Sequence, residues 1–178
     1  MQRIKVNLEL IEAMLYFWQS TSEKEKVSEK YINDVTNMEG FTYVYDSEFN
    51  AESVRRALSA VTNRELFSSN NKKEGRFWNN NLWMMEDLEY TDLMVQPLKK
   101  LNLDVIVDRV KDLEESSRYD EIEVIFSPLH LEEYYIVENK LIINFFRVKP
   151  SFEDDNTYIG DLEITDYIET KIRELLKK

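Results

Sequence analysis

The chain has 178 residues, with 35 Asp and Glu against 23 Lys and Arg, which gives a formal net charge of −12. It has no cysteine, one histidine and three glycines. These counts exclude a disulfide framework, a cysteine nucleophile, Cys-ligated zinc and glycine-rich phosphate loops. The acidic balance also argues against nucleic acid and anionic membranes as partners, because both are bound by clustered Lys and Arg.

The composition predicts a folded, cytoplasmic protein. Hydrophobic residues make up 43% of the chain and aromatic residues 12%, unlike a disordered segment. The longest apolar run covers only residues 13–18, too short for a membrane span or a signal-peptide core. The length suits a single domain, 1–178; the alternative is two packed lobes, a helical one at 1–117 and a sheet-containing one at 118–178.

Apolar side chains at three- and four-residue spacing predict the first helices. The first such stripe covers residues 8–18. Ser22 and Glu25 have the spacing of a capping box, so we expect a second helix to begin there, and Gly40 stands where a C-terminal cap would end it. Residues 41–45 alternate aromatic and smaller side chains, which leaves a short strand and a packed loop as equal alternatives.

Two more helices are predicted before residue 100. Asn50 can cap a third helix, because its side chain can accept a hydrogen bond from a free backbone N–H. Asn71 and Glu74 resemble another capping box, at the start of a longer helix over residues 72–95. Pro97 makes continuation beyond that point unfavourable.

The apolar spacing changes from helical to strand-like after about residue 116. Residues 103–113 still form a helical stripe, with a strand at 103–107 as the alternative. Residues 122–126 alternate in the manner of a half-buried strand. Residues 134–137 and 141–148 flank a turn that contains Asn, which predicts a hairpin.

The last part of the chain predicts a central strand and a closing helix. Residues 141–146 are apolar on both faces, which is typical of a strand covered on both sides. Asp166 and Glu169 have capping-box spacing at the start of a final amphipathic helix. The predicted fold class is α+β: a mostly helical N-terminal part of about five helices, then a small antiparallel sheet and a C-terminal helix.

The chain offers little catalytic machinery. His130 is the only side chain whose ordinary pKa lies near neutrality, and Ser127 and Glu132 are close to it in sequence. A serine nucleophile needs a strained elbow and an oxyanion hole, yet no G-x-S-x-G sequence occurs. We therefore interpret His130 as a loop histidine and assign no catalytic residues.

The acidic residues do not have the spacing of a metal site. The loop at residues 153–156 resembles a calcium loop only superficially, because no register places both oxygen ligands and the required glycine correctly. The helical pairs Glu9–Glu12 and Glu86–Glu89 lack the Glu-x-x-His sequence of a di-iron bundle. We interpret these carboxylates as solvated surface and expect no metal or cofactor.

The most unusual segment is residues 72–85, which is basic at first and then rich in aromatic, Asn and Met residues. Trp78 and Trp83 lie about 140° apart on a helix, so they cannot share one face. Burial in the core is one interpretation; the other is a surface where rings and amides bind a ligand or partner. The candidate residues for such a surface are Arg76, Asn80, Trp83, Glu86 and His130.

These features favour a non-enzymatic interaction or regulatory module that binds a protein partner of basic charge. The alternative is a small-molecule-binding protein or small enzyme with a pocket near the helix of Trp78 and Trp83 or near His130. A third hypothesis is a homo-oligomer in which a second copy completes the strand at residues 141–146.

Overall fold

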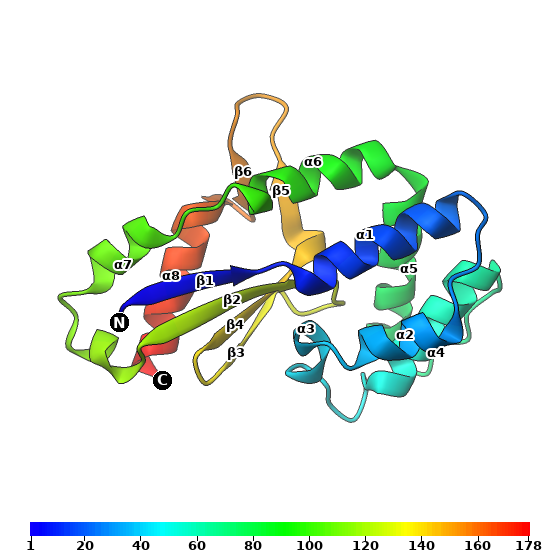
Figure 1. The fold of residues 1–178 in the computed structure, drawn as a ribbon, viewed down its shortest axis with the longest axis horizontal. Coiled ribbons are helices and arrows are strands. Elements are labelled where there is room, and N and C mark those ends of the chain that lie inside the picture. The colour runs from blue at the N-terminus through cyan, green and yellow to red at the C-terminus, as the bar shows by residue number, and fades with distance from the viewer.

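The computed structural model describes residues 1–178 and has eight α-helices, more than the five or so expected, and two small β-sheets. The α+β class is confirmed. Figure 1 shows the larger sheet at one end of an elongated molecule and a group of helices at the other end. No helix has the length and apolar character needed to cross a membrane.

The larger sheet is mixed, where the sequence predicted an antiparallel one. Its strands lie in the order β1-β2-β4-β3; β1 and β2 are parallel, β2 and β4 are parallel, and only β3 and β4 are antiparallel. Strand β1 was not predicted, because its partner β2 follows seven helices later and its own alternation is short. The bounds are β1 (Arg3–Asn7), β2 (Glu121–Ser127), β3 (Tyr134–Val137) and β4 (Lys140–Asn144).

The predicted hairpin and the central position of its second strand are confirmed, but that strand ends at Asn144, and the next residues form the 3₁₀ helix η2 (Phe145–Arg147). Strands β3 and β4 form the hairpin, and Glu138, with φ of 53°, has the positive φ of its turn. Strand β4 lies between β2 and β3, so both of its edges are paired within this chain. Strand β2 is buried on both faces, not half-buried, since Val124 and Ile125 point to opposite sides and are both inaccessible.

The second sheet, absent from the prediction, is a small antiparallel one. It consists of β5 (Val148–Pro150), β6 (Thr157–Ile159) and β7 (Leu162–Glu163). Gly160 has φ of 61° in the β6–β7 turn, a conformation that glycine adopts without strain. The β5–β6 loop, residues 151–156, projects from the molecule (Figure 1).

The first helices differ from the prediction at their ends. Ser22 is the last residue of α1, and it is Ser28 that caps α2. Gly40 lies inside α3, where a side chain would collide with Leu10, so the glycine allows close packing and does not cap a helix. Of the two alternatives for residues 41–45, the strand is wrong: the segment begins in α3 and continues as a turn. The bounds are α1 (Glu9–Ser22), α2 (Glu29–Thr36) and α3 (Glu39–Thr42).

The helices after residue 50 begin as predicted but are divided differently. Asn50 forms a capping box with Ser53, and Asn71 accepts a hydrogen bond from the N–H of Glu74. The predicted helix over 72–95 is two helices, because the Asp87 side chain caps a new one through the N–H of Tyr90. The bounds are α4 (Ala51–Asn63), α5 (Lys72–Glu86) and α6 (Leu88–Lys99). Helix α6 also continues past Pro97, which the sequence placed outside it.

The remaining helices close the sheet end of the molecule. Residues 103–107 are not a strand, since α7 (Asp104–Val110) begins there and is followed by the 3₁₀ helix η1 (Glu114–Arg118). Helix α8 (Ile164–Lys177) is capped by Glu163, not Asp166, and buries Ile168 and Ile172 as predicted. A continuous core of 42 buried residues joins the sheet to the helices from both parts of the chain.

Candidate functional site

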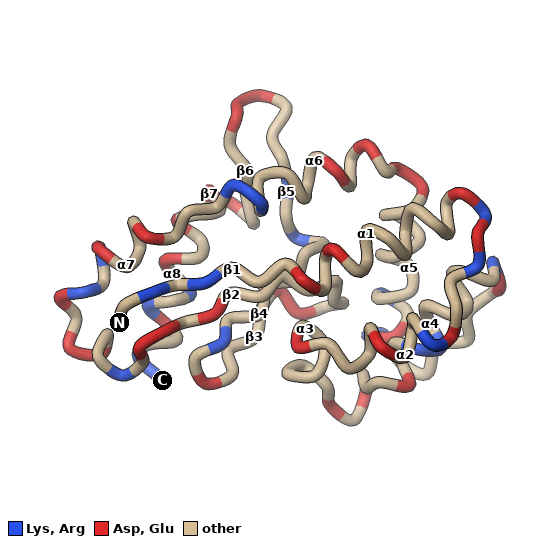
Figure 2. The backbone as a smooth tube through the Cα atoms, viewed as in Figure 1, with Lys and Arg blue, Asp and Glu red and all other residues tan.

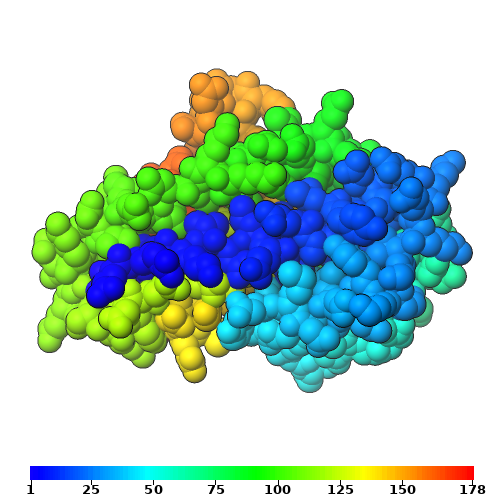
Figure 3. Space-filling model, viewed as in Figure 1, coloured from blue at the N-terminus to red at the C-terminus, as the bar shows by residue number.

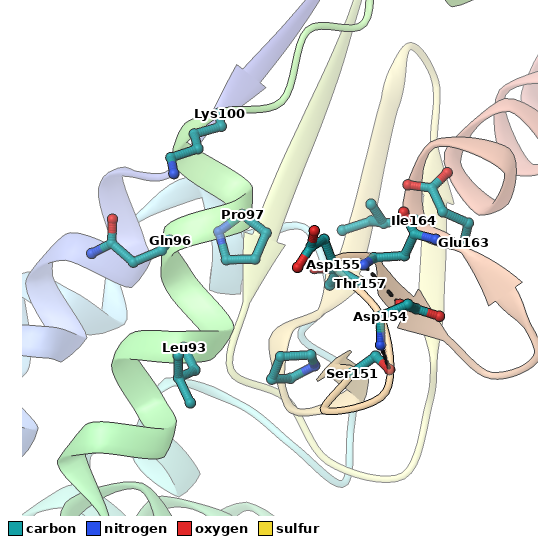
Figure 4. A pocket seen from close by; sticks show the side chains of 12 residues that line it. Leu93, Gln96, Pro97, Lys100, Ser151, Asp154, Asp155, Thr157, Glu163 and Ile164 are labelled. Carbon is teal, nitrogen blue, oxygen red and sulfur yellow. Dashed lines mark hydrogen bonds between the residues drawn. The ribbon is translucent and has the colours of Figure 1, made fainter.

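An open cleft of about 430 Å³ lies between α6 and the β5–β6 loop, with the start of α8 at its far side (Figure 4). Its size falls in the range of about 300–1,000 Å³ that is common for ligand sites. Figure 3 shows the loop standing out from the surface beside α6. The lining side chains include Leu93, Pro97, Lys100, Asp154, Asp155 and Glu163.

One stripe of α6 supplies the apolar side of the cleft. Tyr90, Leu93 and Pro97 recur at three- and four-residue steps, so they share one helix face. Leu93 is 46% exposed. Across from the stripe, Phe152 of the loop is 80% exposed, and its ring centroid lies 6.4 Å from that of Tyr90. Leu93 and Pro97 thus line the cleft itself, whereas Tyr90 and Phe152 contact each other outside its lining.

Carboxylates dominate the charge of the cleft. Asp154 accepts hydrogen bonds from the N–H of Asn156 and the hydroxyl of Tyr158, both at 2.8 Å, and these bonds lower its pKa. Glu163 accepts one from the N–H of Thr165 at 2.9 Å. Asp155 lies on the side of the loop toward Pro97 (Figure 4) and has no hydrogen-bond partner in the chain. Lys100 is the only cation among the lining residues.

Further acidic side chains surround the beginning of α6. Glu86, Asp87, Glu89 and Asp92 are exposed, and none of them forms a salt bridge. Figure 2 shows acidic positions along α6 and at the tip of the β5–β6 loop. Together with the cleft carboxylates they make this part of the surface negatively charged.

His130 lies inside the protein. It is 1% exposed, and its ring meets the edges of Phe49 at 4.6 Å and Tyr135 at 6.3 Å between centroids. Its Nδ1 accepts a hydrogen bond from the N–H of Leu131 at 2.8 Å, whereas Nε2 has no partner. Burial, together with the nearby Lys73 ammonium, lowers the pKa of His130 to about 4. The imidazole is therefore neutral at pH 7 and does not share a surface with Trp83.

Ser127 and His130 form no catalytic relay. The Ser127 hydroxyl is buried and has no hydrogen-bond partner. Glu132 is exposed and contacts the histidine only through its backbone N–H, at 3.5 Å from Nδ1. A nucleophile–base–carboxylate arrangement needs hydrogen bonds between successive side chains, and these are absent here.

The other predicted site residues lie along α5. Arg76 and Asn80 are one turn apart; Arg76 is exposed beside a shallow hollow of about 590 Å³ that Lys72 also lines. Trp83 is 62% exposed in the last turn of α5, and Glu86 ends the helix. The structure thus places Trp83 and Glu86 immediately before α6 in the chain. Trp78 is half-buried instead and stacks on Phe67, with the ring centroids 6.0 Å apart.

Two buried carboxylates belong to structural networks. Burial alone would raise the pKa of Glu74, but hydrogen bonds from Ser53, the N–H of Asn70 and Arg56 outweigh it and lower the pKa. Glu123 is held in the same way by Lys140 at 2.6 Å and by Asn7 at 3.0 Å. No group of three or more His, Cys, Asp and Glu side chains is arranged to hold a metal ion.

The residues that border the cleft were missed as a site from the sequence. Residues 153–156 were interpreted as an acidic surface loop, and Leu93 as part of a helix that ends at residue 95. No protein-family model, curated protein or solved structure matches the chain. The function therefore has to be inferred from the cleft and its charges.

Proposed function

We propose that this protein is a non-enzymatic binding module, and that the cleft beside α6 takes a basic segment of a protein partner. One observation carries the proposal: carboxylates and an exposed apolar side chain occur together at one place on the surface. Asp155, which has no hydrogen-bond partner, and Leu93, which is 46% exposed, line the same hollow, and Phe152 is exposed on the adjoining loop.

The charge chemistry determines the kind of partner. Ionised carboxylates only accept hydrogen bonds, so the group that binds them must be a donor, and Lys and Arg are the charged donors of proteins. Exposed charges of one sign also raise the rate at which an oppositely charged partner associates. The exposed apolar side chains add surface that a partner can remove from water.

The small-enzyme alternative has less support. His130 is 1% exposed and neutral at pH 7, and no hydrogen bond joins it to Ser127 or to a carboxylate. A general base must come within hydrogen-bond reach of the substrate proton that it takes. His130 lines neither the cleft beside α6 nor the hollow beside Arg76.

Co-purification of tagged full-length protein from its source cells tests the proposal. The variant, called the cleft variant, carries Asp155→Asn in the lining and Glu89→Gln and Asp92→Asn at exposed positions of α6. The control carries Asp112→Asn, Glu114→Gln and Glu115→Gln, three exposed acids near η1 with the same change of charge. We expect the wild type and the control to retain the same basic protein at low salt and to release it as the salt concentration increases. We expect the cleft variant not to retain this protein even at low salt.

Two results would contradict the proposal. One is retention of the same partner by the cleft variant and the control alike, because the charge of the cleft would then be irrelevant. The other is the absence of any partner that is enriched with wild type over the cleft variant.

A further inference from the structure

We infer that the hollow beside the first turns of α5 binds a phosphate dianion through the side chains of Lys72 and Arg76. This site is separate from the cleft beside α6 and does not depend on the proposed function. The hollow has a volume of about 590 Å³. Sites for small molecules commonly have about 300–1,000 Å³, so free phosphate and a phosphorylated metabolite both fit.

The lining of the hollow contains two cations and no carboxylate. Lys72 and Arg76 are exposed, lie four residues apart on one face of α5, and form no salt bridge in the chain. The other residues of the lining are Ser69, Asn70, Asn71, Gly75, Asn79 and Leu131. In a chain with a net charge of −12, two unpaired cations in a hollow without acids favour an anion as its ligand.

Unused hydrogen-bond donors line the same hollow. The side chains of Ser69, Asn70 and Asn79 are exposed, and none of them has a hydrogen-bond partner in the chain; only the backbone N–H of Asn70 is used. Their hydroxyl and amide groups can donate to the oxygens of an anion. The loop before α5 and the helix itself therefore both supply donors to one space.

The Glu74 carboxylate does not oppose this positive charge. It is 3% exposed, does not line the hollow, and is paired inside the protein with the Arg56 guanidinium at 3.1 Å. It also accepts a hydrogen bond from the Ser53 hydroxyl at 2.6 Å. The positive end of the α5 dipole adds attraction for an anion, but every helix has such an end. The two side-chain cations therefore define the site.

The donors favour a phosphate over a carboxylate. A phosphate group carries a charge of about −1.5 to −2 at pH 7 and has three acceptor oxygens, so it can bind two cations and still accept hydrogen bonds from amides. The planar guanidinium of Arg76 matches two phosphate oxygens, and the Lys72 ammonium supplies a second positive charge. A carboxylate has one charge and would leave one of the two cations without a partner.

An NMR titration of the isotope-labelled, full-length protein tests the inference. The probes are inorganic phosphate, glucose 6-phosphate, glucose and acetate, each added at pH 7 and constant ionic strength. We expect saturable shifts of the amide signals of residues 69–79 with both phosphates and none with glucose. Acetate should bind at least about tenfold more weakly, because it loses one charge-assisted contact. Tighter binding of glucose 6-phosphate than of inorganic phosphate would identify a phosphorylated metabolite as the ligand, and equal binding would identify free phosphate.

A charge variant and its matched control assign the binding to the two cations. Lys72→Gln with Arg76→Gln changes only exposed helix positions, so we expect it to fold and to bind phosphate at least about tenfold more weakly. The control is Lys26→Gln with Lys111→Gln. It removes the same charge from exposed lysines that form no salt bridge and do not line the hollow, and it should bind as the wild type does.

Gly75→Leu tests the hollow without a change of charge. A Cβ at residue 75 would lie 3.3 Å from the Ser69 Oγ, so a larger side chain at this position occupies space between two residues of the lining. We expect phosphate binding to weaken at least about tenfold, as for the loss of one charge-assisted contact. Circular dichroism of each variant shows whether it has kept its helices.

Three results would overturn the inference. One is the absence of saturable shifts with both phosphates. Another is a similar affinity of the Lys72 and Arg76 double variant and of its control for phosphate, because binding would then follow net charge alone. The third is undiminished binding by a folded Gly75→Leu protein, because the phosphate would then lie outside the hollow. None of these results bears on the cleft beside α6, which shares no lining residue with the hollow.

Discussion

Removal of the Glu74 carboxylate tests whether the contact between α4 and α5 depends on a buried charge. Glu74 is 3% exposed. Its oxygens accept hydrogen bonds from the Ser53 hydroxyl at 2.6 Å, the N–H of Asn70 at 2.9 Å and the Arg56 guanidinium at 3.1 Å. We expect Glu74→Ala to lower the free energy of unfolding, because it leaves three donors without their acceptor.

The expected size follows from these contacts. A hydrogen bond to a charged group contributes about 1.5–3 kcal/mol, but bonds to one carboxylate are not additive. The side chain of Arg56 is 28% exposed, so water can replace part of what it loses. We therefore expect a loss of about 2–4 kcal/mol for Glu74→Ala, and less for Glu74→Gln, which keeps the shape and one acceptor oxygen.

Urea denaturation measures this loss, with the slope of the transition showing that unfolding has stayed cooperative. Glu65→Ala is the control, because Glu65 is exposed and forms no salt bridge; a change within about 0.5 kcal/mol is expected.

The pKa of Glu74 is lowered in the folded protein. Its contribution is therefore present above the unfolded pKa and is lost as pH falls through the folded pKa. A loss below about 1 kcal/mol at pH 7, or one that persists unchanged in acid, would refute the reasoning, since lost charge-assisted bonds should cost more.

Two further predictions concern residues packed in the interior. The pKa of His130 is lowered to about 4 in the folded protein. Between about pH 6.5 and 4 the imidazole is therefore protonated in the unfolded chain but not in the folded protein, so the free energy of unfolding falls as the pH decreases through this range. An imidazole titration by NMR checks this, and a midpoint near 6.5 would contradict it. Gly40→Ala should destabilise the protein by about 1–3 kcal/mol in urea denaturation, because the new methyl group would collide with Leu10 and press on Ser127. Denaturation midpoints equal to those of wild type would show that α3 can move away.

The parts of the fold that were predicted correctly depend on local sequence. The β3–β4 hairpin joins neighbouring residues, and the two apolar faces of residues 141–143 follow directly from their side chains, whereas residues 145 and 146, predicted in the same strand, lie in a 3₁₀ helix. Strand β1 depends instead on pairing with β2, at Val6 and Val124 for example. A parallel strand takes its partner from a distant segment, so nothing within its own few residues identifies the pairing.

Helix ends show the same limit at shorter range. Asn50 caps α4 as predicted, because the capping contact to Ser53 is complete within four residues. At Ser22 a capping-box spacing is present but unused, since α1 continues to that residue. Pro97 lies in the last turn of α6, where the helix tolerates a missing hydrogen bond that the sequence rule treats as a stop.

The net charge of −12 does not by itself select a binding surface. Exposed acids such as Asp108 and Glu114 also lie on the α7–η1 segment, where Val105 is 40% exposed, yet these residues line neither the α6 cleft nor the hollow beside Arg76. Carboxylates alone attract any cation weakly and are screened by salt. The α6 cleft differs in that the exposed Leu93 lines the same hollow as three carboxylates, with the exposed Phe152 on the adjoining loop. In the proposed function both features act together: the carboxylates attract a basic partner, and the apolar contact selects among basic sequences.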